Sequence, residues 1–179
     1  MTGINGRRIA VLATDGVEQV ELMEPARALR EAGAHVDIVS LKSGAIQGMN
    51  HDKPGDMIPV DLALKDAQAQ QYDALLLPGG VANPDKLRIA LEAVKFVGAF
   101  VAADKPIAAI CHGPWTLINA GGVRGKRMTS WPSLQQDLIN AGATWTDAAV
   151  VKDHHLVTSR KPDDIPKFNE AMIEMFAAG

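Results

Sequence analysis

The fold of this chain is decided by the stretch Pro106-Ile-Ala-Ala-Ile-Cys-His-Gly-Pro-Trp-Thr-Leu-Ile118. An apolar run rich in branched residues ends at Cys111, the only cysteine, and Gly113-Pro114 follows two residues later. A second apolar run then begins at helical spacing, with its proline in the first turn, where a missing backbone N–H does no harm. We therefore predict a buried strand, a sharp turn at Cys111 and a helix.

The position of Cys111 has a chemical consequence. The unpaired N–H groups and the dipole of a helix N-terminus favour a thiolate over a thiol, and His112 is the next residue. The arrangement resembles the nucleophile elbow of hydrolases, with cysteine in place of serine. A lone cysteine in an apolar strand is commonly inert core. The place of Cys111 at the end of the strand, beside a histidine and a Gly-Pro pair, favours a functional role.

Strand and helix patterns alternate along almost the whole chain. Strands are predicted at 8–14, 34–41, 72–80 and 127–131, and helices at 20–32, 63–70, 87–103, 134–140 and from 163 onward. The Gly- and Pro-rich stretch 42–60 indicates a hairpin or an irregular excursion, and 150–159 a two-stranded ribbon. Strands separated by helices imply right-handed crossovers. We predict one doubly wound α/β domain over residues 1–179, with a mainly parallel sheet covered on both faces.

Composition limits the classes of function. A formal charge of −3 gives no basic surface for nucleic acid. No apolar stretch reaches the roughly 18 residues expected of a membrane span. A single cysteine cannot form an intrachain disulfide, so we expect a soluble cytoplasmic protein in a reducing compartment, binding neither nucleic acid nor membrane.

In a doubly wound sheet, ligands bind beyond the carboxyl ends of the strands. Gly79 and Gly80 end one predicted strand, and their backbone N–H groups could approach a substrate oxygen closely enough to form an oxyanion hole. A bare glycine pair on its own indicates only a permissive turn. Neither a P-loop motif nor G-x-G-x-x-G occurs, so this is not a phosphate-binding loop.

Four other residues border the expected crevice. Glu18 follows the first strand. If its carboxylate lay beside a Cys111 thiolate, repulsion between the two charges would raise the pKa of both groups. The pair avoids this repulsion if Glu18 keeps its proton and donates a hydrogen bond to the sulfur. By spacing alone, Glu18 is a helix N-terminal acid and Asp85 a helix-start acid. Trp115 and Trp131 could form an apolar wall or belong to the core.

Two histidines stand apart from this crevice. His154 and His155 lie at the predicted turn of the ribbon, and no cysteine or histidine lies at ligand spacing elsewhere. We therefore expect no metal site.

Five segments in a fixed order resemble the ThiJ/PfpI superfamily. They are Ala13-Thr-Asp-Gly-Val-Glu-Gln-Val-Glu-Leu22, Ala74-Leu-Leu-Leu-Pro-Gly-Gly80, Ala109-Ile-Cys-His-Gly-Pro114, Ile139-Asn-Ala-Gly142 and Val157-Thr-Ser-Arg-Lys-Pro-Asp-Asp164. The resemblance is greatest to the PfpI/YhbO-type branch, described as intracellular cysteine peptidases, protein deglycases or general stress proteins. It implies the flavodoxin-like fold shared with class I glutamine amidotransferases. Those enzymes need a distant His-x-Glu, which is absent downstream of Cys111.

The resemblance also implies roles for the site residues. Cys111 would be the nucleophile, Glu18 its hydrogen-bonding carboxyl partner and His112 the general base. The N–H groups of Gly80 and His112 would form the oxyanion hole. An acid from a neighbouring subunit, at the position of Asp85, would orient the histidine, which requires a homodimer or a higher oligomer. No metal or cofactor is implied.

Two classes of function follow. As an enzyme, the chain would attack small reactive carbonyls, glycated groups or peptides through Cys111. Carbonyl chemistry is favoured over proteolysis, because peptide cleavage must also protonate an amine leaving group. As a non-enzymatic stress protein or chaperone, it would use the same cysteine as an oxidation sensor.

Overall fold

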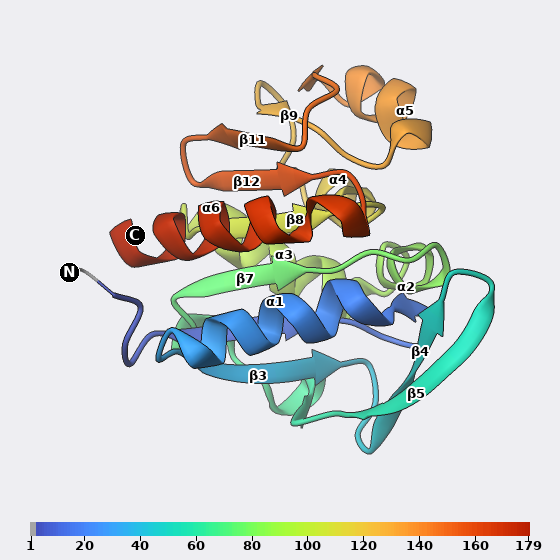
Figure 1. Cartoon of the computed structure of the whole chain (residues 1–179), viewed down its shortest axis with the longest axis vertical. Helices are drawn as coiled ribbons and strands as arrows, with labels where there is room; N and C mark the ends of the chain where they lie inside the picture. The colour runs from blue at the N-terminus through green and yellow to red at the C-terminus, as the bar shows by residue number, and fades with distance from the viewer. Residues whose placement is uncertain (1–2) are drawn as a thin grey trace.

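The computed structural model describes residues 3–179 and centres on a seven-stranded sheet (Figure 1). The strand order is β11-β12-β8-β7-β1-β3-β6. Their bounds are β1 Arg8–Leu12, β3 His35–Ser40, β6 Leu62–Ala63, β7 Ala74–Leu77, β8 Ile107–Ile110, β11 Val150–Asp153 and β12 Leu156–Ser159. All neighbours pair in parallel except β11 and β12. The predicted doubly wound, mainly parallel α/β fold is confirmed.

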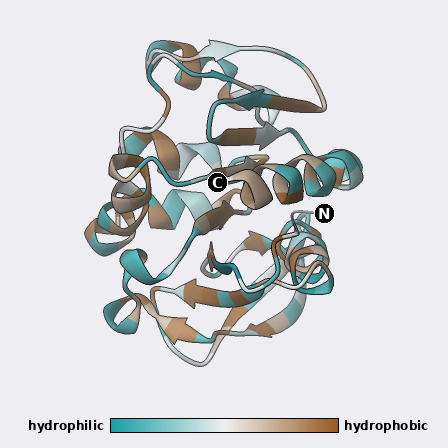
Figure 2. Cartoon of the chain, turned by 90° about the vertical axis from the view of Figure 1, so that its left-hand side faces the viewer, coloured by the Kyte–Doolittle hydropathy of each residue, from teal (hydrophilic) through white to brown (hydrophobic). Residues whose placement is uncertain are grey.

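Helices cover both faces of the sheet, so the chain has two apolar cores. The helices α1 (Gln19–Glu31) and α6 (Ile165–Ala178) cover one face, and α3 (Leu91–Ala102), α4 (Pro114–Asn119) and α5 (Gln135–Asn140) the other. Because side chains alternate along a strand, Ile9 and Val11 of β1 enter the first core, and Ala10 and Leu12 the second. The strands carry much of the apolar colour in Figure 2. Within residues 3–179, no helix has the length and apolar character needed to cross a bilayer.

The excursion at 42–60 is an antiparallel hairpin of β4 (Ala45–Asn50) and β5 (Lys53–Pro59). Its first strand pairs with β2 (Val17–Glu18), just before α1. This pairing places the hairpin beyond the end of β1 (Figure 1). The predicted ribbon is the β11–β12 hairpin.

Three predicted elements differ from the structure. The helix expected at 63–70 is two 3-10 turns, η1 (Leu64–Asp66) and η2 (Ala69–Gln71). The helix expected at 87–103 begins only at Leu91, because Ala90 is extended, and Leu87 ends a separate short helix, α2 (Ala82–Leu87). Two further 3-10 turns, η3 (Pro132–Leu134) and η4 (Pro162–Asp164), precede α5 and α6.

The strand predicted at 127–131 is only β9 (Arg127–Met128), which pairs with β10 (Thr144–Trp145) outside the main sheet. The backbone N–H groups after Met128 form hydrogen bonds outside any strand pairing. Thr129 N–H donates to Thr158 Oγ1 at 2.9 Å, and Trp131 N–H to the Cys111 carbonyl at 2.9 Å. The segment therefore crosses the end of β8 and does not continue a strand.

Candidate active site

Cys111 lies on a strained turn directly after β8. Its φ of +62° is in the left-handed region, which costs a residue with a Cβ about 1–2 kcal/mol. Three hydrogen bonds hold the turn: Cys111 N–H donates to Ser159 O (3.0 Å), Gly113 N–H to Ile110 O (2.9 Å), and Trp131 N–H to Cys111 O (2.9 Å). A Cβ on Gly113 would lie 2.5 Å from a backbone oxygen, so this position requires glycine. The predicted strand, turn and helix are all present.

The carboxyl group beside the thiol belongs to Glu21, in the first turn of α1, and not to Glu18 as predicted. The Glu21 side chain is fully buried and lies beside the Cys111 side chain, close enough for each group to shift the pKa of the other. Glu21 Oε1 also accepts the Gly79 N–H at 3.1 Å. Oε2 is buried and has no hydrogen-bond partner among the described residues.

Burial sets the protonation of this pair. It raises the pKa of Glu21 to about 8, and the nearby charge of Glu18 adds to the effect. Burial also raises the pKa of the Cys111 thiol, as does Glu21, while the N–H groups of Gly80 and His112 oppose the increase. Two like charges this close cannot both be formed in a dry site. The pair therefore carries at most one negative charge, and at neutral pH the Glu21 carboxyl largely keeps its proton.

Glu18 lies in the same cavity but has a different partner. Its carboxylate oxygens accept the His51 N–H at 3.1 and 3.2 Å, which ties α1 to the turn of the β4–β5 hairpin. Because Glu18 ends β2 and Glu21 lies inside α1, the two carboxyls reach different neighbours. The site thus has two carboxyl groups, of which only that of Glu21 contacts the sulfur.

His112 contacts the thiol through Nδ1, which lies 3.1 Å from Cys111 Sγ. Its ring stacks on Trp131 with centroids 5.8 Å apart and meets the edge of Trp115 at 5.1 Å. Burial lowers the His112 pKa to about 4, so the imidazole is neutral at neutral pH. No carboxylate within residues 3–179 forms a hydrogen bond or ion pair with this ring.

The two glycines after β7 have different roles. The Gly79 N–H is taken by Glu21, so it is not free to bind a substrate oxygen, contrary to expectation. The Gly80 and His112 N–H groups both point toward the Cys111 sulfur. The Gly80 N–H also interacts with the Glu21 carboxyl, and the assignment of Gly80 and His112 to an oxyanion hole stays a prediction.

Asn83 holds the glycine loop in place. This buried side chain accepts the Thr14 N–H at 2.8 Å and donates to the carbonyl oxygens of Pro78 (3.1 Å) and Gly79 (3.0 Å). One amide thereby joins the ends of β1 and β7. The glycine loop keeps its position relative to the elbow because of this side chain.

Trp115 and Asp85 lie outside the cavity. Trp115 packs behind His112 and donates its Nε1–H to Asp137 at 3.0 Å, so it does not form the substrate wall that was predicted for it. Trp131 lines the cavity instead. Asp85 is exposed on α2 and makes no contact with His112 within the described chain, so its role across a subunit interface stays a prediction.

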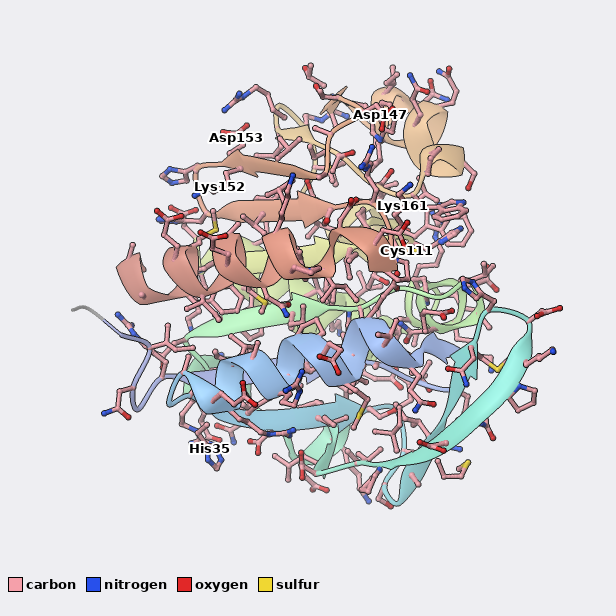
Figure 3. The ribbon with its side chains drawn as sticks, in the orientation of Figure 1. His35, Cys111, Asp147, Lys152, Asp153 and Lys161 are labelled. Atoms are coloured by element: carbon pink, nitrogen blue, oxygen red, sulfur yellow. The ribbon has the colours of Figure 1, made fainter. Side chains whose placement is uncertain are left out.

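The site opens into a cavity of about 430 Å³ at the carboxyl edge of the sheet, where Figure 3 places Cys111. Segments far apart in sequence line it: Gly16, Glu18, Glu21, Met49, His51, Asp52, Gly80, Val81, Ala82, Cys111, His112, Trp131 and Pro162. Its size is within the range of small-ligand sites, about 300–1,000 Å³.

Residues 7–175 match the sequence profile of the DJ-1/PfpI family. This chain belongs to that family. YraA of Bacillus subtilis strain 168, provisionally named a cysteine protease, is 43% identical over 94% of this chain and 98% of its own. Deglycase PYRAB04690 of Pyrococcus abyssi is 44% identical over 88% of this chain and 92% of its own.

A solved structure gives the same family by fold. It is a two-domain protein of Anabaena variabilis with DJ-1/ThiJ/PfpI-like and ferritin-like domains. It superposes with a TM-score of 0.86 and 33% identity over 94% of this chain. The present chain spans about half of that protein, 47% of its length.

Sequence reasoning missed several site residues of this DJ-1/PfpI protein. Glu21 was missed although it follows Glu18 by three residues, a spacing that places side chains on one helix face. The turn residues His51 and Asp52 gave no local signal, because only the pairing of β2 with β4 brings them over the elbow. Pro162 reaches the cavity from the segment after β12.

Proposed function

We propose that this DJ-1/PfpI protein is a cofactor-independent cysteine hydrolase that converts reactive carbonyls, α-oxoaldehydes such as methylglyoxal, into hydroxy acids. One observation carries the proposal: the N–H groups of Gly80 and His112 and the buried Glu21 carboxyl all interact with the Cys111 thiol. The relatives named deglycase and cysteine protease support hydrolase chemistry in the family.

The reaction needs no external oxidant. The sulfur of Cys111 adds to the aldehyde carbon as its proton passes to the ionised Glu21 carboxyl, and the Gly80 and His112 N–H groups bind the new oxyanion. The hydrogen of this carbon then moves as a proton, through an enediol, to the neighbouring carbonyl carbon. The first carbon is oxidised and the second reduced, which gives a hydroxyacyl thioester. Water cleaves the thioester and releases the hydroxy acid and the thiol.

Glu18 and His112 are placed to move the remaining protons. Both line the cavity around the sulfur, and the Glu18 carboxylate is held by its hydrogen bond to the His51 N–H. A substrate carbon bound to the sulfur would lie between them. We assign the carbon-to-carbon proton transfer to Glu18 and the activation of water to the neutral His112 imidazole.

The state of His112 favours carbonyl chemistry over peptide cleavage. An amine leaving group must be protonated, and an imidazole with a pKa of about 4 rarely carries a proton at neutral pH. Proteolysis would require a carboxylate at the outer nitrogen of His112, which Asp85 of a second copy could supply. Asp85→Asn should then abolish peptide cleavage but leave carbonyl turnover intact.

The test is lactate formation from methylglyoxal by the wild type and by Cys111→Ser. We expect many turnovers per chain in the wild type and none in the variant. Lactate must be the readout, because hemithioacetals and hemiaminals form reversibly and disappear when free aldehyde is removed. Wild-type protein that forms no lactate, or Cys111→Ser protein that forms it at the wild-type rate, would refute the proposal.

A second candidate is a redox-responsive stress protein. The Glu21 carboxyl would donate a hydrogen bond to a sulfinate formed on Cys111 by peroxide, and the buried site would protect the product. Mass spectrometry after peroxide treatment should then show two added oxygen atoms on Cys111, and fewer in Glu21→Leu. This role and carbonyl turnover differ in stoichiometry, because a sensor reacts once. A lone free cysteine also fits the reducing cytoplasm, where we place the protein.

A further inference from the structure

A second cluster of ionisable side chains lies at the edge of the sheet opposite Cys111. Asp104 is in the loop between α3 and β8, and His154 and His155 form the turn of the β11–β12 hairpin. All three precede the parallel strands β8 and β12, whereas Cys111 follows β8. Figure 3 shows this separation, with Asp153 of the hairpin and Cys111 toward opposite ends of the strands.

Both histidines turn a ring nitrogen toward the same carboxylate oxygen. His154 Nε2 lies 3.1 Å from Asp104 Oδ2, and His155 Nδ1 lies 3.2 Å from it. The two rings stack with centroids 4.0 Å apart. One ligand atom from each residue lies within 4.8 Å of the others.

We propose that Asp104, His154 and His155 bind a divalent transition-metal ion of the zinc class. Two imidazole nitrogens and one carboxylate oxygen form a common donor set for such ions. Zinc lies about 2.0–2.2 Å from these atoms, so ligands of a tetrahedral ion are roughly 3.3 Å apart. The two nitrogen–oxygen separations are close to this value, and small side-chain rotations would admit the ion.

The metal would replace protons that now hold the cluster together. Without an ion, ring N–H groups donate to the carboxylate, and His155 Nδ1 also lies 2.8 Å from the Asp104 carbonyl oxygen. An ion takes the deprotonated nitrogens as ligands and releases those protons to water. The Asp104 carbonyl oxygen is a further protein donor beside the cluster, and water would complete the coordination.

The proposed ion would join two segments that are far apart in sequence. It would tie the loop after α3 to the β11–β12 hairpin, and so fix the edge strand β11, whose only partner in the main sheet is β12. Binding to the folded state alone raises stability by mass action. The expected role is structural, separate from the chemistry at Cys111.

The test is Zn²⁺ titration of untagged protein by calorimetry, in a Cys111→Ser background that removes the competing thiolate. We expect one saturable ion per chain. That ion should be lost in Cys111→Ser/His154→Ala and Cys111→Ser/Asp104→Asn. Cys111→Ser/His35→Ala is the matched control, because His35 is also exposed and lies 3.4 Å from a carboxylate, that of Asp37, but has no second histidine. The control should keep the ion.

Two further readouts test the same site. Zn²⁺ should raise the Tm of Cys111→Ser but not that of Cys111→Ser/His154→Ala, and circular dichroism should show both variants folded. Co²⁺ should give visible absorption typical of nitrogen and oxygen ligands, again only with His154 present. Absence of saturable binding in Cys111→Ser, or undiminished binding in the His154 variant, would overturn the proposal.

Discussion

The two edges of the sheet present the same kinds of side chain under opposite conditions. At the carboxyl edge, burial raises the pKa of Glu21 to about 8 and lowers that of His112 to about 4. At the amino edge, the pKa of the exposed Asp104 is lowered, first by its hydrogen bond to His154. One edge therefore keeps its groups neutral, and the other favours the charged carboxylate.

The difference shows that solvation, more than residue type, determines what a carboxyl and an imidazole can do. Removing water penalises the charged forms, so at neutral pH Glu21 is largely protonated and His112 is unprotonated. In these states the carboxyl can give a proton to a substrate and the imidazole can accept one. At the exposed edge, water stabilises the charged Asp104 carboxylate, and His154 and His155 form hydrogen bonds or ion pairs with it. Four predictions test this contrast.

The largest expected effect is on stability, from Glu21→Gln. Folded Glu21 keeps its proton up to about pH 8, whereas an unfolded glutamate loses it near its ordinary pKa of 4.5. Because the folded state binds more protons in this window, stability falls as pH rises through it. Glu21→Gln lacks this penalty and should gain on the order of 5 kcal/mol relative to wild type between about pH 4 and pH 9. Urea unfolding across this range measures the difference, and a pH-independent difference would contradict the assignment.

Gly79→Ala should damage both stability and activity. The added Cβ would lie 2.5 Å from Glu21 Oε1 and 2.6 Å from Cys111 Cβ. Overpacking of this kind costs roughly 1–3 kcal/mol, and a 1 Å displacement of the reacting groups can cost about a hundredfold in rate. Gly121→Ala is the control, because its φ of +77° is strained but no atom lies near its Cβ. That variant should lose about 1 kcal/mol of stability and no activity; equal activity losses in the two variants would argue against tight packing at the elbow.

The pH dependence of kcat/KM for methylglyoxal should follow the titration of the Cys111–Glu21 pair. The reactive form has lost one proton, so the rate should rise about tenfold per pH unit and level off above about pH 8. In Glu21→Gln the rate at neutral pH should be lower and the plateau near pH 8 should disappear, because the remaining thiol has a raised pKa of its own and its ionised fraction keeps increasing above pH 8. An unchanged profile in the variant would assign the titration to another group.

The smallest effect is expected from Asp104→Asn. The pKa of Asp104 is lowered in the folded state, so its contribution to stability is present above about pH 3.8, the ordinary pKa of an aspartate, and is lost as the pH falls. This sign is opposite to that of Glu21. Because the carboxylate is exposed, the change in Tm without metal should be small and should vanish in high salt. Methylglyoxal turnover should stay at the wild-type level, and a loss of turnover would show that the two edges are coupled.

The sequence predicted the architecture because its signals are local. Apolar runs, Gly113-Pro114 and the glycine loop each mark the end of an element, and the alternation of strands and helices then implies a parallel sheet. The elbow at Cys111 followed from the same local pattern. The strand predicted at 127–131 was wrong because its backbone partners, such as Thr158, are tertiary.

The site was only partly predictable, because the side chains that face the cavity depend on how helices and loops pack against the sheet. The spacing of residues in the sequence does not specify this packing. Whether Glu18 or Glu21 meets the thiol depends on how α1 lies against β8. Whether Trp115 or Trp131 faces the cavity depends on the path of the segment that crosses the elbow. The cluster around Asp104 was missed because its members are fifty residues apart in sequence.

The hydrogen bond from Cys111 N–H to the Ser159 carbonyl also has a consequence for synthesis of the chain. The ribosome adds residues in order, so Cys111 emerges long before the strand that holds its turn. Until β12 pairs with β8, the thiol belongs to an unfinished chain without its strained backbone or its cavity wall at Pro162. The strained turn at Cys111 and the complete cavity around it therefore form only when the chain is almost fully synthesised.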